Sequence, residues 1–209
     1  MPSTKIVTTE YKTWLKDLKH SFQSSQIKAS IQVNTTLLEF YWKLGNDIIE
    51  KQKEYKWGSG FLQQLSHDLM SEFPNIKGFS KRNLELVRKW TLFWQQVVSQ
   101  MEAENTKQVV SQILQIPWGH NIVIIQKCKD TDEALYYVNN TIQNGISRSV
   151  LLHQIETNLY KRDGKAVTNF ENTLPPLQSD LAREITKDPY NFDFLTLTQG
   201  YQEKELEDA

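Results

Sequence analysis

Apolar residues recur at intervals of three and four along most of this sequence, and few glycines or prolines interrupt them. Leu38, Tyr41 and Ile48 illustrate the spacing, which places side chains on one face of an α-helix. Their stretch, from 27 to about 55, holds one glycine, Gly45. The chain has 8 Gly and 6 Pro among 209 residues, below the usual ~7% and ~5%. We therefore expect an all-α protein with long helices.

Residues suited to helix caps divide this pattern into further segments. Ser, Thr and Asp favour the start of a helix, whereas Gly and Pro mark its end. The predicted helices are 9–23, 27–55, one capped by Ser59 that ends at Pro74, 81–99 capped by Ser80, a short one from Thr106 through Leu114, one opened by Asp130 and closed by Gly145, and one opened by Ser147 and closed by Gly164.

The order of these segments indicates three regions. Residues 1–100 form an N-terminal helical region with a helix-turn-helix-like unit at 59–99, in which Gly78 is expected to take a positive φ in the turn. Residues 106–164 form a second, small helical subdomain. Residues 165–209 hold three of the six prolines and are interpreted as an extended linker or docking tail.

The helix after Ser80 carries the clearest functional pattern. At about 100° per residue, one half of this helix carries Leu84, Val87, Trp90, Thr91, Trp94, Val97 and Val98, and four cations with one Glu fall within about 120° on the other half. The free N–H groups at the helix start near Ser80 can hold a phosphate, and the Asn83 amide can pair with base edges. The predicted nucleic-acid-binding residues are Lys77, Ser80, Lys81, Arg82, Asn83, Arg88 and Lys89, with Gln95 and Gln96 as further amides. A solvated helix face that binds nothing is the alternative.

Composition excludes several function classes. The 24 Lys and Arg against 25 Asp and Glu exclude a uniformly basic binder, so any DNA contact must be local. No run reaches the ~18 apolar residues of a membrane span, so we expect a cytoplasmic protein without a membrane partner. The single cysteine, Cys128, excludes an internal disulfide and a thiolate zinc cage, and is expected to be a plain buried thiol.

Catalytic groups are sparse. The four histidines are far apart in sequence, and neither a phosphate-binding loop nor a nucleophile motif occurs. The two E-x-K triplets, at 10–12 and 54–56, lie in predicted helices without the second acidic residue that a metal-dependent nuclease needs. We therefore expect no catalytic residue, no metal, no cofactor and no small-molecule substrate in this chain.

Six tryptophans suggest a second role. Their helical spacing with Leu and Val favours core packing, with a dimer interface as a further use. A homodimerisation or protein-interaction module without nucleic-acid contact is therefore the alternative function, and a homo-oligomer is expected in either case.

Several segments together resemble the N-terminal domain of the YhcG family, bacterial proteins in which a domain of unknown function is joined to a PD-(D/E)XK nuclease. The resemblance spans roughly 33–197, and its most specific segments are GFSKRNL, IPWGH and KDPYNFDFL. The family's segments fall on Gly78, Phe79, Ser80, Arg82, Asn83 and Leu84, and on Pro117, Trp118 and His120, a possible functional motif.

The resemblance implies an accessory role. The family's nuclease follows the last of these segments, and the chain ends at Ala209. We therefore expect a non-catalytic module that binds duplex DNA through 81–99 and targets a nuclease. Divalent metal is expected in that nuclease domain of the longer protein, not in this chain.

Overall fold

The computed structural model describes residues 8–55, 60–99, 103–128 and 130–163, together with 185 and 190, the side chains of 103–105 excepted. Within these ranges all regular structure is helical, which confirms the all-α prediction. The elements are α1 Thr9–Glu54, α2 Phe61–Glu72, the 3-10 turn η1 Lys77–Phe79, α3 Lys81–Val98, α4 Ala103–Gln115, α5 Trp118–Lys127, α6 Thr131–Asn144, α7 Arg148–Glu156 and α8 Leu159–Asp163.

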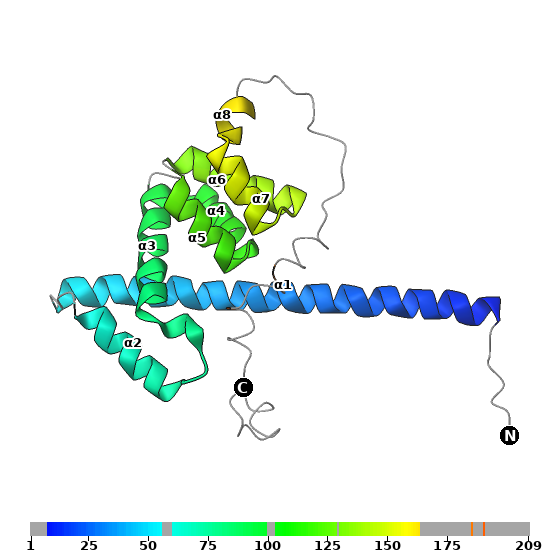
Figure 1. Cartoon of the computed structure of the whole chain (residues 1–209), viewed down its shortest axis with the longest axis horizontal. Coiled ribbons are helices and arrows are strands. Elements are labelled where there is room, and N and C mark those ends of the chain that lie inside the picture. Colours follow the sequence, from blue (N-terminus) through cyan, green and yellow to red (C-terminus); the bar gives the residue numbers. More distant parts are fainter. Residues whose placement is uncertain are drawn as a thin grey trace.

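Helix α1 is one continuous helix of 46 residues, where the sequence predicted two. Thr8 caps it by accepting a hydrogen bond from the Tyr11 N–H at 3.2 Å. The polar residues 23–26 end the first apolar stripe, but none of them is a helix breaker, so the helix continues through them. Its C-terminal half carries the other helices, and its N-terminal half extends away from them (Figure 1).

Helix α3 crosses α1 and buries the apolar side that the sequence predicted. Leu84, Val87, Trp90 and Trp94 are each 0% exposed. The crossing is closest at Gly45, where an added Cβ would lie 2.8 Å from the Thr91 Cβ and closer still to its Oγ1. Glycine is therefore required at this point by space rather than by backbone conformation.

One hydrophobic core joins α1, α3, α4, α5, α6 and α7. Aromatic rings meet edge to face at its centre, with centroids 5.4 Å apart for Trp42–Trp90 and for Trp90–Trp118. Tyr41 packs on Trp118 at 5.0 Å. The prediction that tryptophans pack in the core is confirmed for these residues, but Trp14 is 58% exposed.

Three buried asparagines connect these helices. Asn34 Nδ2 donates to Leu114 O at 3.0 Å, and Asn121 Nδ2 donates to Ile113 O at 3.0 Å. Asn121 Oδ1 also accepts from the Trp90 indole N–H at 2.9 Å. A buried amide is costly unless it is paired, and each of these finds partners on another helix or turn.

Asn83 belongs to the same group. Its Nδ2 donates to Gly78 O at 2.7 Å, and its Oδ1 accepts from the Trp118 indole N–H at 2.9 Å. The residue is 1% exposed. The prediction that Asn83 offers its amide to base edges is therefore wrong, because the amide faces the core and links η1 to α5.

Gly78 also has a different role from the predicted one. It lies in η1, and Gly145 is the glycine with positive φ in the described ranges. A Cβ at Gly78 would lie 2.6 Å from the Tyr41 hydroxyl oxygen. The turn needs glycine because Tyr41 lies against it.

The local caps are confirmed in most places. Asp130 accepts from the Glu133 N–H at 2.7 Å, Gly145 ends α6 with φ 57°, and Ser147 caps α7. The helix after Ser147 ends at Glu156 rather than Gly164, because Asn158 takes a left-handed φ of 55° and separates α7 from α8.

Two other boundaries differ from the prediction or fall outside the description. Helix α4 begins at Ala103, so 103–105, predicted as connection, are helical and Thr106 lies inside the helix. The predicted cap Ser59 and, apart from 185 and 190, the predicted tail 165–209 lie outside the described residues.

Gly45→Ala tests the crossing of α1 and α3. The new methyl group collides with Thr91, so we expect the free energy of unfolding to fall by about 1–3 kcal/mol, although alanine favours a helix by ~1 kcal/mol. Gly60→Ala is the control, because nothing lies within 4 Å of its Cβ position. Chemical denaturation measures both, and equal stabilities would contradict the close crossing.

Asn83→Ala tests the buried amides. The Trp118 indole N–H and the Gly78 carbonyl each lose a partner in the interior, which should lower the free energy of unfolding by about 2–4 kcal/mol. The neighbouring Arg82→Ala changes an exposed side chain and should stay within about 0.5 kcal/mol of the wild type. Denaturation midpoints that match for the two variants would exclude a structural role for Asn83.

Candidate nucleic-acid interface

Helix α2, the turn η1 and helix α3 follow one another in the predicted order of helix, turn and capped helix. Phe79 holds the turn in place. The centroid of its ring lies 5.8 Å from that of Phe73, just after α2, and 6.2 Å from that of Phe40 on α1. Ser80 caps α3, because its hydroxyl accepts from the Asn83 N–H at 3.4 Å. The start of α3 is therefore fixed relative to α1 and α2.

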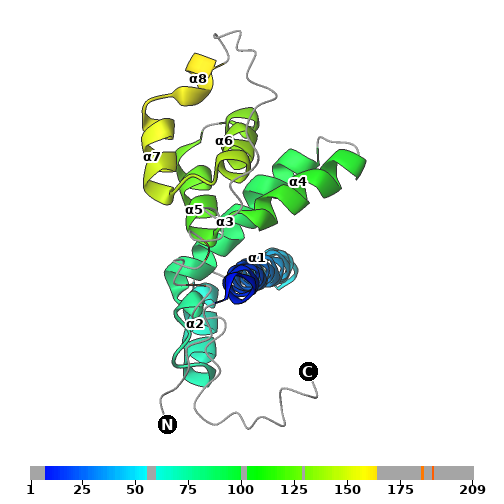
Figure 2. The same cartoon turned by 90° about the vertical axis from the view of Figure 1, so that its right-hand side faces the viewer.

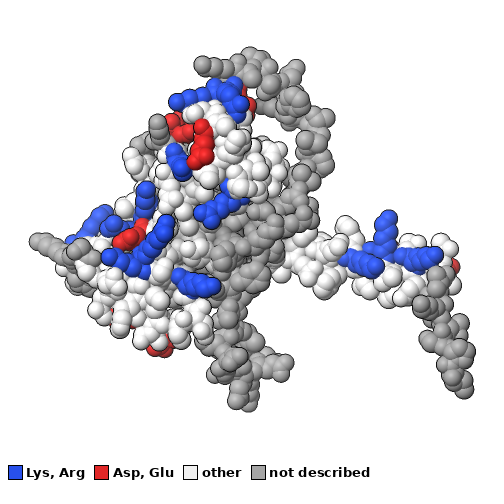
Figure 3. Space-filling view, in the orientation of Figure 1, with Lys and Arg blue, Asp and Glu red and all other residues white. Residues whose placement is uncertain are grey.

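Four cations of η1 and of the first half of α3 are exposed to solvent: Lys77, Lys81, Arg82 and Lys89. Lys81 Nζ lies 3.9 Å from Glu85 Oε1, with both side chains about half exposed. Such a surface pair is weak and leaves the lysine available to an anion. Figure 3 shows Lys and Arg gathered over the crossing of α1 and α3, and again along the extended part of α1 on the same face.

Arg88 differs from these four. Its Nη1 donates to Gln52 Oε1 on α1 at 2.9 Å, and the residue is half-buried. Gln95, predicted as a free amide, donates to Asn46 Oδ1 at 2.5 Å. Both lie at the edge of the arc that α1 covers, which a helical wheel of α3 alone does not reveal. Neither residue belongs to the exposed surface in the way the sequence suggested.

The segment Pro117–His120 is buried at the start of α5. Trp118 is 0% exposed and hydrogen-bonded to Asn83, and His120 Nε2 lies 2.9 Å from the Ile146 carbonyl oxygen. These contacts give the motif a structural role, since they connect α5 with the start of α3 and with the turn before α7.

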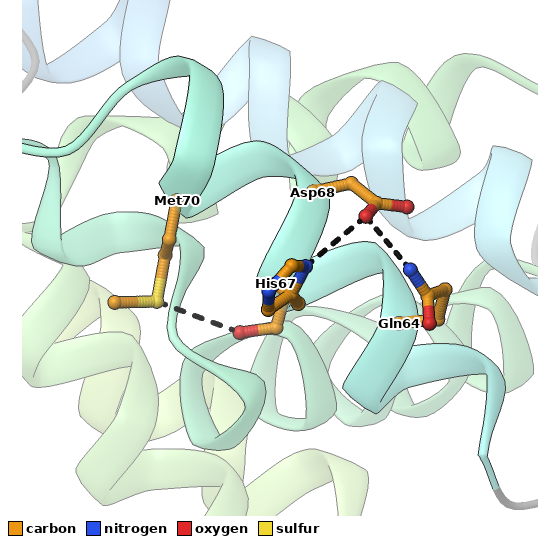
Figure 4. A network of polar contacts seen from close by, with 5 residues as sticks. Gln64, His67, Asp68 and Met70 are labelled. Carbon is orange, nitrogen blue, oxygen red and sulfur yellow. Dashed lines mark hydrogen bonds and ion pairs between the residues drawn. The ribbon is translucent and has the colours of Figure 1, made fainter.

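Helix α2 carries a small polar cluster on its surface (Figure 4). Asp68 Oδ1 accepts from Gln64 Nε2 at 2.8 Å and lies 3.3 Å from His67 Nδ1. The His67 and Asp68 side chains are 74% and 60% exposed. Three or more potential metal ligands do not come together anywhere in the described ranges.

Cys128 is buried at the end of α5. Burial raises the pKa of its thiol to about 12, with Glu133 and Asp130 adding to the shift. A thiol that stays protonated is a poor nucleophile, so Cys128 is the plain buried residue that the sequence predicted. Across the described helices, none is both long enough and apolar enough to cross a membrane.

Comparison with known proteins identifies the family. The chain is 25% identical over 218 residues to a protein of Escherichia coli (strain K12) described as "Putative nuclease YhcG", and the match covers 91% of this chain. It covers 57% of that relative's length, so the chain spans little more than half of it. No solved structure is significantly similar to the chain. The model of the DUF1016 N-terminal domain family matches residues 17–162, so the chain belongs to that family.

Proposed function

We propose that this chain is a duplex-DNA-contacting module that targets a nuclease to its substrate. The observation that carries the proposal is the division of α3, which buries Trp90 and Trp94 completely and leaves Lys81, Arg82 and Lys89 in solvent. A helix held in this way presents its cations in a fixed arrangement, and phosphate contacts depend on such positioning.

The contacting set is smaller than the sequence suggested. It consists of Lys77, Lys81, Arg82 and Lys89, which we name the α3 cation set. Asn83 is left out because it is buried, and Arg88 because it is held by Gln52. Because contacts from such cations to phosphates carry no sequence information, we expect the α3 cation set to bind the backbone of many sequences.

The family relationship supports the link to a nuclease. The relative described as a nuclease is longer than this chain, which covers 57% of it. We infer that cleavage, with its divalent metal, belongs to the part of such proteins that lies outside the matched region. The role of this chain is then to supply affinity for the duplex.

Duplex binding as a function of salt tests the α3 cation set. Four phosphate contacts predict that log affinity falls with log salt at a slope of about −3.6, which is about 150-fold between 50 and 200 mM salt. Replacing Lys77, Lys81, Arg82 and Lys89 by alanine should weaken binding at least tenfold at 50 mM salt and remove most of this slope. Fluorescence anisotropy with a labelled duplex measures both quantities.

A second quadruple variant controls for net charge. Lys107, Lys127, Arg148 and Lys161 are exposed and lie on other helices, so replacing them by alanine removes the same charge elsewhere. We expect this variant to keep most of the wild-type affinity. Equal losses in the two variants, or no binding by the wild type at 50 mM salt, would contradict the proposal.

A further inference from the structure

The N-terminal part of α1 carries an apolar surface that the rest of the described chain leaves open. Tyr11, Trp14, Leu18 and Phe22 are 40%, 58%, 48% and 63% exposed. Asn34 is the first fully buried residue along α1 within the described part. We name residues 9–29 of α1 the arm, and we name α1 from Asn34 onward together with α2 to α8 the body. It extends beyond the other helices in Figure 1.

The apolar stripe of the arm does not continue the face that α1 turns toward the core. At about 100° per residue, the residues Tyr11, Leu15, Leu18 and Phe22 of the stripe and the full set of buried residues of α1, from Asn34 to Ile49, are centred about 130° apart around the helix axis. In Figure 2, which looks nearly along α1, helix α2 lies below it, α4 lies above it and to the right, and the remaining labelled helices lie above it or to the left.

The spacing of the stripe is that of a coiled-coil seam. Tyr11, Leu15, Leu18 and Phe22 follow one another at intervals of 4, 3 and 4 residues. Ser25 and Ala29 continue the series at intervals of 3 and 4 with side chains small enough for close approach. Alternation of three and four keeps a seam facing one partner helix. The stripe therefore fits another α-helix better than it fits a flat surface.

We propose that the arm pairs with the arm of a second copy of this chain, in parallel. The residues on either side of the seam decide whether the two helices pair in parallel or antiparallel. Lys12, Lys19 and Gln26 lie on one side of the seam, and Trp14, Ser21 and Lys28 lie on the other. In a parallel pair the two sides meet, so that Trp14 faces the partner's Lys19 and Ser21 faces the partner's Gln26. An antiparallel pair instead brings each side against itself and places lysine near lysine.

The geometry of the body agrees with this pairing. The seam ends at Ala29, before the body begins at Asn34, and the body lies on the other side of α1. Two copies can therefore join their arms while their bodies stay apart. The pairing uses a different surface from the α3 cation set, so it stands whether or not the chain binds nucleic acid.

The area of the stripe sets the expected strength. Tyr11, Trp14 and Phe22 together expose on the order of 300 Å² of aromatic surface per chain. Two copies thus offer about 600 Å² before their leucines are counted, against the ~1,200 Å² at the lower end of stable interfaces. We therefore expect a reversible dimer whose population rises with concentration.

Sedimentation velocity of the chain from about 1 to about 200 µM tests the pairing. We expect a monomer–dimer equilibrium whose dissociation constant rises at least tenfold in a Leu18→Glu, Phe22→Glu variant. Leu92→Glu is the matched control, because Leu92 is 43% exposed on α3. Circular dichroism and the unfolding midpoint establish that each variant keeps its folded body. A monomer at every concentration, or a dimer indifferent to the arm variant, would overturn the proposal.

Cross-linking tests the direction. Ser25 lies in the seam, so in a parallel pair a Ser25→Cys residue meets its own copy, and mild oxidation should give a disulfide-linked dimer. Thr13→Cys is the control, because Thr13 is exposed on the opposite side of the arm and should not cross-link. The native Cys128 is buried and does not interfere. A dimer that needs the arm but gives no Ser25→Cys cross-link would overturn parallel pairing, since the two arms would then be antiparallel or the arm would bind elsewhere on the partner.

Discussion

This fold has to supply hydrogen-bond donors for the backbone carbonyl groups at the ends of buried helices. Helix α4 ends inside the core, where its last carbonyl groups have no partner within the helix. Asn34 from α1 and Asn121 from α5 donate to two of these carbonyls, at Ile113 and Leu114, and to the carbonyl of Ile116 just after the helix. Because a buried carbonyl without a donor is costly, these amides determine where α4 and α5 can lie against α1.

The same chemistry sets the orientation of α3. Asn83 and Trp90 lie on its buried side, and their hydrogen bonds to Trp118 and Asn121 fix the rotation of the helix about its axis. Once that rotation is fixed, Lys81, Arg82 and Lys89 have no position other than the solvent side. The cationic surface is thus a consequence of the interior, and the motif around Trp118 contributes to it without touching solvent.

Features that depend on a few neighbouring residues could be predicted from the sequence. The caps at Asp130 and Ser147 and the C-terminal Gly145 are of this kind, because a cap is decided within one helical turn. The buried side of α3 was also predictable, since the spacing of Val87, Trp90 and Trp94 is enough to define it. These local rules account for most of the helices and for which side of α3 meets solvent.

Features decided by a second helix were not predictable in this way. Arg88 lies at the margin of the exposed arc of α3, where contact with Gln52 decides its position. Asn83 differs from it, because at about 100° per residue it falls between Trp90 and Trp94, so the helical wheel of α3 already places it on the buried side. Gly78 looked like a turn glycine, and only the presence of Tyr41 against it shows that space is the reason. The continuity of α1 was missed for a local reason, because the polar residues 23–26 end the apolar stripe but contain no helix breaker.

Helix α1 carries the apolar stripe of the arm and packs against α3, so it fixes how that stripe and the α3 cation set lie relative to each other. The cations of the arm appear on the same face as those of α3 in Figure 3, while the apolar stripe is turned about 130° from the core side. Pairing through the apolar side would bring two cation sets into one molecule, and linked sites bind far more tightly than either alone when both can engage. Under the proposed function, the α3 cation set of each chain would then gain affinity for a polyanion from being doubled in the dimer.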